Sequence, residues 1–515
     1  MSEQTSNKRI AKNTILLYFR MLLTMIISLY TSRVVLKILG VDDFGIYETV
    51  GGVIGLFTFL QGALASGTSR FLAFEIGVGD EKKMKLNFSS IFLIHILLGV
   101  VIIALGETAG LWFVENKLSF ASDRFDAAVF AYHMSVAAVV VSIVQIPYTA
   151  SIMSHERMNI YAYFSILEVL LKLGIVYLLL ISDADKLKFY SALILVVQVM
   201  IFSGYAIYCT IHYKESQLHR QYDLSIIKNV LSFSFWNLLT NVTLSLKNQG
   251  AVVLLSMFFN PAIVTGKAVA SKVNFAANQF ANNFRVASNP QIIKSYASGD
   301  NGQSQRLTLQ TAKFSFFLML ILTVPILLTA DSVLLLWLGQ IPEYSVAFLQ
   351  LALATSLINS MDNSFYTALC AVGRLKMNSI LCTIVSIITI PIAYIFYKLG
   401  YGPVTIAWII LIDDFFISFV IKPYVMIREA NFQLIDIVKV CFSCFVVTIL
   451  SLPLPLYLHV LIENLSIDPI ISDVIVGITG VLSTALAVWF VGLDSEMRVK
   501  LLSLTKSKIS EYVKK

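Results

Sequence analysis

The sequence is poor in charged residues. Only 13% of its 515 residues are Asp, Glu, Lys or Arg, whereas 57% are hydrophobic, and the mean hydropathy is +0.79. A water-soluble fold of this length cannot bury so much apolar surface, which excludes an ordinary soluble enzyme or binding domain. Lipid must therefore solvate much of the chain, and the composition predicts a membrane protein.

Cysteine is also scarce, and all five cysteines lie in or beside apolar runs. Cys441 and Cys444 have CxxC spacing, but no second cysteine pair and no histidine lies near enough in sequence to complete a zinc site. We interpret the cysteines as small packing residues. The sequence predicts no metal site, no catalytic residues and no resident cofactor.

Long polar segments are lacking as well. Apolar runs of spanning length recur at residues 13–39, 44–76, 87–114, 125–152, 158–182, 188–212, 228–258, 263–294, 307–338, 345–372, 377–397, 403–427, 435–462 and 469–492. This pattern predicts an all-α polytopic membrane protein of about fourteen transmembrane helices with short loops and no soluble domain.

The loop charges predict the orientation. If the N-terminus is cytoplasmic, roughly 22 Lys and Arg fall on the cytoplasmic side and about 6 on the outside. Residues 1–12 are polar and basic, and the first apolar run lacks a small-residue cleavage site, so we expect no cleavable signal peptide. Both termini are expected in the cytoplasm, and the net charge of +7 is interpreted as a topology signal rather than as nucleic-acid binding.

Two sequence landmarks recur in the first 300 residues. FRMLLT at residues 19–24 resembles FWNLLT at residues 235–240, and the Gly-Asp pair at 79–80 recurs at 299–300. A parallel repeat of six helices keeps its orientation in the membrane because six is an even number. We therefore expect a six-helix lobe at residues 1–214, a second at 215–430, and two further helices with a basic cytoplasmic tail at 431–515.

One expected span carries a polar stripe along its whole length. Its members are spaced by three or four residues, as on one face of a helix, and the opposite face is apolar. At about 1.5 Å per residue the stripe is roughly 33 Å long, near the thickness of the hydrocarbon core. We interpret it as lining a wet cavity in a transporter for a polar, anionic substrate. The stripe consists of Lys267, Ser271, Asn274, Asn278, Asn282, Arg285 and Asn289.

Basic residues in the first two spans of each expected lobe could form a ladder of cations across the membrane. A cation inside a span needs a partner, water or a function, and arginine and lysine both suit phosphate or pyrophosphate. The alternative is that Arg20, Arg70 and Arg285 lie near helix ends and only extend to the interface. The candidate pyrophosphate-binding residues are Arg20, Arg33, Arg70, Lys247, Lys267, Lys272 and Arg285.

Amides and carboxylates complete the candidate site. Amide side chains offer the donors and acceptors that sugar hydroxyls need, and the candidates are Asn237, Asn241, Asn274, Asn278 and Asn282. Carboxylates could couple transport to a gradient of H⁺ or Na⁺. For Asp413 and Asp414 the alternative is a salt bridge to a neighbouring basic residue. The candidates are Glu48, Asp362, Asp413 and Asp414.

Two segments resemble a known superfamily. Residues 33–47 read RVVLKILGVDDFGIY, which is similar to the first-loop pattern of the multidrug/oligosaccharidyl-lipid/polysaccharide (MOP) exporter superfamily, and residues 366–374 read YTALCAVGR, similar to its tenth-span ending. Together with about fourteen spans, these segments resemble the Wzx-type polysaccharide flippases. The resemblance implies two six-helix bundles arranged as a V around a cavity, with alternating access.

The resemblance also implies a substrate and a location. The substrate would be a polyprenyl-pyrophosphate-linked oligosaccharide, a repeat unit of O-antigen, capsule or exopolysaccharide, moved across the bacterial inner membrane. The expected partners are this lipid and the membrane lipids, and a polysaccharide polymerase and glycosyltransferases would be partners of the same pathway.

Three alternatives remain open at this stage. A MATE-type multidrug or cation antiporter exports organic cations and favours an acidic or aromatic cavity, and a lipid II flippase would have the same fold. A polytopic glycosyltransferase would need acidic residues outside the membrane, and Asp42 and Asp43 lie there. That loop is only about five residues long, however, so we do not expect an enzyme.

Overall fold

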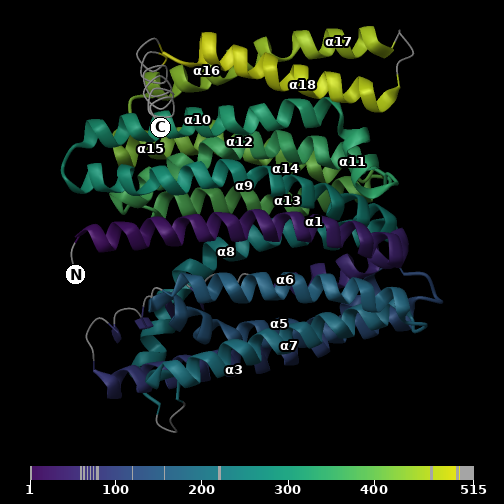
Figure 1. Ribbon diagram of the computed structural model, residues 1–515, viewed down its shortest axis with the longest axis vertical. Coiled ribbons are helices and arrows are strands. Elements are labelled where there is room, and N and C mark those ends of the chain that lie inside the picture. Colours follow the sequence, from purple (N-terminus) through teal and green to yellow (C-terminus); the bar gives the residue numbers. More distant parts are fainter. Residues whose placement is uncertain are drawn as a thin grey trace, which may run out of the picture. The chain divides into compact units, whose positions relative to one another are not determined.

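The computed structural model describes most of the chain. The described residues are 3–57, 61, 64–65, 68–69, 71–72, 75–76, 80–118, 120–155, 157–217, 222–463, 468–494 and 498. All regular elements in these ranges are helices (Figure 1). The expected all-α class is therefore confirmed.

The chain folds into two compact units. Unit 1 comprises residues 1–268, 342–344 and 386–406, and unit 2 comprises residues 269–341, 345–385 and 407–515. The expected lobe boundaries at 214 and 430 remain a prediction.

The helices of unit 1 follow the expected spans closely. They are α1 (Glu3–Gly55), α3 (Glu81–Leu105), the π-helix η1 (Gly106–Gly110), α4 (Leu111–Lys117), α5 (Phe125–Ser154), α6 (Met158–Ile181), α7 (Lys186–His212), the 3-10 helix η2 (Lys214–Ser216) and α8 (Leu224–Phe258). Three helices have residues in both units: α9 (Pro261–Ala297), α13 (Lys376–Lys398) and α14 (Thr405–Phe416).

The remaining helices belong to unit 2. They are α10 (Asn301–Leu328), α11 (Ala330–Leu338), α12 (Ser345–Val372), the π-helix η3 (Ile417–Ile421), α15 (Lys422–Ala430), α16 (Leu434–Ser451), α17 (Pro453–Glu463), α18 (Pro469–Ala487) and the π-helix η4 (Val488–Gly492).

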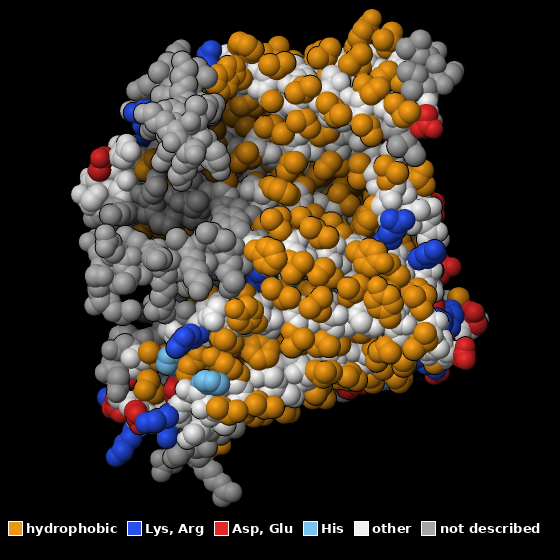
Figure 2. Space-filling model, viewed as in Figure 1, with side chains coloured by type: hydrophobic (Ala, Val, Ile, Leu, Met, Phe, Trp, Pro, Cys, Tyr) orange, Lys and Arg blue, Asp and Glu red, His pale blue; other side chains and the backbone are white. Residues whose placement is uncertain are grey.

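Nine helical segments among the described residues are long and apolar enough to cross a membrane. Figure 2 shows hydrophobic side chains over most of the described surface in its view, with Lys, Arg, Asp and Glu gathered mainly toward the helix ends. A surface of this kind suits lipid around the middle of the helices and water at their ends. The chain is a multi-pass membrane protein.

A single glycine divides α1 into two helices. Gly40 has φ 79° and ψ 172°, a conformation that only glycine adopts without strain, and the backbone on either side is helical. The first two expected spans, 13–39 and 44–76, therefore meet at this residue. The structure describes the second span continuously only as far as residue 57.

A buried tyrosine fixes the π-helix η1 in unit 1. The wider turn of a π-helix leaves backbone carbonyls without their usual partners. The Tyr132 hydroxyl, on α5, donates to the carbonyl of Gly106 at 2.7 Å, and a Cβ at Gly110 would lie 2.1 Å from that hydroxyl. Glycine at position 110 therefore allows α5 to approach η1.

Unit 2 is built around α10, which packs on α12, α16 and α18. The core residues from these helices include Phe317, Phe365 and Cys444. Gly480 on α18 lies so close to α10 that a Cβ there would be 3.4 Å from the Cα of Pro325. The core continues to Ile417 and Val425 on either side of Lys422, so this lysine stands in apolar surroundings.

Candidate functional site

Part of the polar stripe on α9 packs against α12 within unit 2. Asn278 donates to the backbone carbonyl of Asn274 at 3.0 Å and to the Ser356 hydroxyl at 2.8 Å, and the Thr367 hydroxyl donates to the amide oxygen of Asn289 at 3.1 Å. The side chains of Asn274, Asn278 and Asn289 are half-buried. Asn278 and Asn289 of the stripe therefore form hydrogen bonds that link α9 to α12.

Arg285 lies on the same stripe and keeps unused donors. It is 9% exposed, and its Nη2 donates to the amide oxygen of Asn282. Its Nη1 is buried and has no hydrogen-bond partner. The carboxylate of Asp362 lies close enough for its charge to act on this guanidinium. Arg285 therefore has the charge and the free donor needed to bind a further anion.

Two carboxylates of unit 2 have specific partners. Lys422 Nζ lies 3.3 Å from Asp362 Oδ1, and Asn359 on α12 donates to Asp414 Oδ2 at 3.0 Å. Asp413 is buried beside Asp414 on α14. Asp362 is therefore paired with a cation, whereas its role and those of Asp413 and Asp414 in ion coupling stay predictions.

The candidate cations of unit 1 have varied environments. Arg20 donates to the Ser165 hydroxyl at 3.3 Å and lies 4.9 Å from the centre of the Tyr161 ring, both on α6. Arg33 is exposed, and Lys247 is 7% exposed on α8. Arg20 is thus held against a neighbouring helix rather than standing alone in a cavity.

The two lysines of α9 fall in different units. Lys267, in unit 1, is half-buried, and the charge of Glu48 on α1 acts on it. Lys272, in unit 2, is also half-buried. Of the remaining candidates, Arg70 lies outside the described residues. Asn237 and Asn241 belong to α8, but the structure does not describe their side chains.

Two glycines of the second expected span, Gly52 and Gly55, serve helix packing. A Cβ at Gly52 would lie 2.7 Å from the Val252 side chain, and one at Gly55 would lie 2.8 Å from that of Gln249, both on α8. The Ser245 hydroxyl, also on α8, donates to the carbonyl of Gly55 at 3.1 Å. These two glycines therefore allow close contact between α1 and α8.

An arginine outside the candidate site joins three segments of unit 1. Arg124, just before α5, donates to both carboxylate oxygens of Asp43 on α1, at 2.7 and 2.5 Å, and to Asp185 before α7 at 2.6 Å. The Asp185 hydrogen bond is the main reason that the pKa of Arg124 is raised. Burial acts to raise the pKa of Asp185, but hydrogen bonds from Arg124 and from the Lys188 amide outweigh it and lower that pKa.

A second pair ties the segment before α8 to α5. His155 Nε2 lies 2.5 Å from Glu215 Oε1, and the ring of His155 stacks on Tyr213 with 4.1 Å between the ring centres. Burial acts to raise the pKa of Glu215, but hydrogen bonding, chiefly from His155, outweighs it and lowers that pKa. Neither pair is visible in the sequence, because 60 residues or more separate the members of each.

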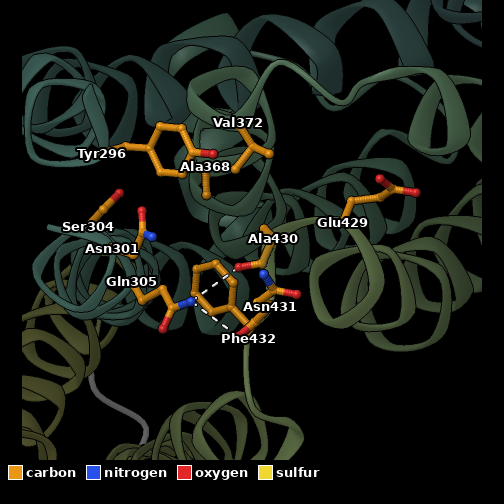
Figure 3. A pocket seen from close by; sticks show the side chains of 10 residues that line it. All are labelled: Tyr296, Asn301, Ser304, Gln305, Ala368, Val372, Glu429, Ala430, Asn431 and Phe432. Atoms are coloured by element: carbon orange, nitrogen blue, oxygen red, sulfur yellow. Dashed lines mark hydrogen bonds between the residues drawn. The ribbon is translucent and has the colours of Figure 1, made fainter. Parts of the chain in front are cut away.

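A small cavity of about 80 Å³ lies where α10 begins and α12 and α15 end (Figure 3). Gln305 crosses it and donates to the carbonyls of Ala430 and Asn431 at 3.1 and 3.2 Å. A cavity of this volume holds a few water molecules. None of the candidate site residues lines it.

No cluster of three or more histidine, cysteine or acidic side chains among the described residues could hold a metal ion. All five cysteines are free thiols. Asp43, one of the two acidic residues that a glycosyltransferase would use, is occupied by Arg124.

Comparison with known proteins identifies the fold through solved structures alone. No protein-family profile matches the chain, and no curated protein matches it. "Lipid II flippase MurJ, inward closed conformation" is similar with a TM-score of 0.66 and 15% identity, covering 92% of this chain and 98% of that one. An inward-facing multidrug resistance MATE family transporter of the MOP superfamily has a TM-score of 0.66 and 15% identity, covering 81% and 98%.

A third solved structure differs in the character of its binding pocket. It is described as a MOP superfamily transporter from Pyrococcus furiosus in which the reverse polarity of the binding pocket suggests a different function. It has a TM-score of 0.58 and 15% identity, and covers 82% of this chain and 97% of that one. The chain has the all-α polytopic fold of the MOP superfamily flippases and transporters.

Proposed function

We propose that the protein is a flippase that moves a polyprenyl-pyrophosphate-linked oligosaccharide across the bacterial inner membrane by alternating access. The observation that carries the proposal is Arg285, a buried cation on α9 with an unpartnered Nη1 and an amide neighbour, Asn282. An unused buried donor is costly, so a ligand that accepts from it is favoured. A phosphate offers both the charge and the acceptors.

The remaining candidate residues would bind other parts of the head group. The cations Arg20, Arg33, Arg70, Lys247, Lys267 and Lys272 would bind the pyrophosphate along its path, and the amides Asn237, Asn241, Asn274, Asn278 and Asn282 would bind sugars. The polyprenyl tail would stay in lipid. Gradient coupling through Glu48, Asp413 or Asp414 is compatible with this scheme.

The cell biology of the proposal follows from its substrate. Lipid-linked repeat units are made on the cytoplasmic leaflet, so glycosyltransferases would supply the substrate and a polymerase would consume it. The charge distribution of the loops supports cytoplasmic termini.

Lipid II flippase is the second candidate, because the MurJ structure aligns with about a tenth more of this chain than the MATE transporter does. Lipid II is also a polyprenyl-pyrophosphate-linked saccharide, so the two candidates share their head-group chemistry. Complementation separates them: rescue of a strain depleted of its lipid II flippase would favour lipid II, and restored surface polysaccharide would favour the repeat-unit lipid.

The direct test is deletion of the gene followed by analysis of undecaprenyl-linked oligosaccharide. We expect this lipid to accumulate on the cytoplasmic leaflet and surface polysaccharide to be lost. Arg285→Ala and Lys267→Ala should also abolish surface polysaccharide at normal protein levels. Lys439→Ala, which removes an exposed cation on α16, is the matched control. Normal polysaccharide in both Arg285→Ala and Lys267→Ala would refute the assignment of these cations.

A further inference from the structure

Lys422 is a buried cation to which the proposed function assigns no role. It is the first residue of α15 and follows the π-helix η3 directly, and π-helical turns are frequent at functional sites. Lys422 is 2% exposed, and Val425 and Met426, one turn further along the same face, are fully buried. The helix therefore directs the ammonium into unit 2.

The ammonium meets a carboxylate and an aromatic ring, both on α12. Lys422 Nζ lies 3.3 Å from Asp362 Oδ1 and 5.3 Å from the centre of the Tyr366 ring. Asp362 Oδ1 has no partner that meets the angular requirements of a hydrogen bond, so the contact is one of charge alone. A contact without directed hydrogen bonds is easier to exchange for another anion.

The same carboxylate serves a second cation. The charge of Asp362 acts on Arg285, whose buried Nη1 has no hydrogen-bond partner. The other carboxylates nearby are Asp413 and Asp414 on α14, and Asn359 donates to Asp414. Asp362 therefore contacts Lys422, and its charge also acts on Arg285.

The open side of this cluster lies along α12. Asn363, Tyr366 and Cys370 are exposed, and the Asp362 side chain is 18% exposed, whereas that of Lys422 is 3% exposed. An anion arriving on this face would therefore reach Asp362 and Tyr366 before it reached the ammonium. Binding would require the carboxylate to give way.

We propose that Asp362 is a resident anion that neutralises Lys422 and Arg285 in the empty protein, and that a phosphate of the transported head group displaces it. The inference rests on the proposed function and adds Lys422 to the head-group site. Two buried cations without an anion would be costly in a membrane, and the carboxylate removes that cost while no substrate is bound. A phosphate replaces it because it carries more charge and more acceptor oxygens. Release of the substrate is then assisted by return of the carboxylate.

The experiment measures binding of farnesyl diphosphate to the full-length protein in detergent, with uncharged farnesol as the ligand control. Asp362→Asn should bind the diphosphate about tenfold more tightly than the wild type, within the range typical of coupled sites, because the competing anion is gone. Lys422→Met should bind it about tenfold more weakly. Asp362→Glu, which keeps the anion, should bind the diphosphate more weakly than Asp362→Asn does. Asp436→Asn, which removes an exposed carboxylate on α16, is the control and should match the wild type.

Several results would overturn the inference. Unchanged or weaker diphosphate binding by Asp362→Asn would show that Asp362 stabilises the fold or contacts the ligand, and does not compete with it. If replacing Na⁺ by choline alters wild-type binding and Asp362→Asn removes this dependence, Asp362 is an ion-coupling group instead. Absence of diphosphate binding in all variants would also refute it.

The proposed function is judged separately by lipid accumulation in the deletion strain. If the lipid accumulates in the deletion strain but diphosphate binding does not depend on Asp362, the proposed function is supported and the inference about Asp362 is refuted. Because Asp362→Asn leaves Lys422 without its carboxylate, the variant could unfold at a lower temperature. The diphosphate should then raise the melting temperature of Asp362→Asn more than that of the wild type, and an equal or smaller rise would contradict the inference.

Discussion

Arg124 holds Asp43 in a two-point ion pair: Nε donates to Oδ1 at 2.7 Å and Nη2 donates to Oδ2 at 2.5 Å. The same guanidinium binds Asp185, so one side chain joins α1 to the N-terminal ends of α5 and α7. Such bidentate pairs are geometrically specific as well as strong. The segments concerned are far apart in the sequence, and this residue fixes them together.

Arg124→Ala is expected to lower the free energy of unfolding of the protein by about 1–3 kcal/mol. The estimate lies between the values for exposed and buried pairs, because the Arg124 side chain is 26% exposed. Unfolding in mixed micelles measures the effect. Arg124→Lys keeps the charge but not the two-point geometry and should recover only part of the loss, and full recovery would contradict the geometric explanation.

Glu215 is expected to stabilise the fold in a pH-dependent way. Its pKa in the folded protein lies below the ordinary value of 4.5, so its contribution is complete above that pH and is lost as the pH falls toward the lowered value. The melting temperature of Glu215→Gln should therefore lie below that of the wild type at pH 7, and the gap should narrow below about pH 4.5. Glu81→Gln removes an exposed carboxylate paired with Lys214 and should show little gap at any pH. A Glu215→Gln gap that persists unchanged at low pH would rule out this linkage.

Gly45 is expected to tolerate no side chain. A Cβ at this position would lie 2.0 Å from the carbonyl oxygen of Pro261, a backbone atom that cannot move without shifting the start of α9. Gly45→Ala should cost roughly 1–3 kcal/mol of stability through overpacking. Gly174→Ala on α6, where nothing lies within 4 Å, should instead be neutral or stabilise by about 0.5–1 kcal/mol. Equal effects of the two substitutions on thermal stability would contradict the contact.

Gly40→Ala tests the break in α1. Nothing lies within 4 Å of a Cβ at this position, so the expected cost of about 1–3 kcal/mol comes from the backbone conformation alone. Gly51→Ala, in the helical part of α1 and equally free of neighbours, is the matched control and should not destabilise. A neutral effect of Gly40→Ala in the same unfolding assay would mean that the break does not require glycine.

The sequence predicted the helices well where charged or turn-forming residues mark the two ends of an apolar run. The expected spans at 125–152 and 188–212 correspond to α5 and α7 within two residues at each end. It did not predict the interruptions inside long runs. The run at 307–338 divides into α10 and α11 at Thr329. The run at 403–427 contains the π-helix η3, and a π turn depends on packing and has no reliable sequence signature.

The candidate site was less accessible from sequence. Helical spacing correctly placed Asn282 beside Arg285 and Asn274 beside Asn278, since such neighbours lie on one face. The partner of Asp362 is Lys422, 60 residues away, and spacing along one helix cannot reveal it. Asn278 and Asn289 bond to α12 for the same reason: the neighbouring helix supplies the partner, and its position is a property of the fold.

The distribution of the thiols gives the protein a natural reporter of its own. Cys370 is exposed, whereas Cys209 and Cys444 are buried and Cys382 and Cys441 are half-buried. Cys370 stands one helical turn from Tyr366 on the open side of α12. A maleimide fluorophore should therefore react there first in the wild-type chain without any engineered cysteine. Its reaction rate and emission then provide a direct optical signal of whether that face of α12 is occupied.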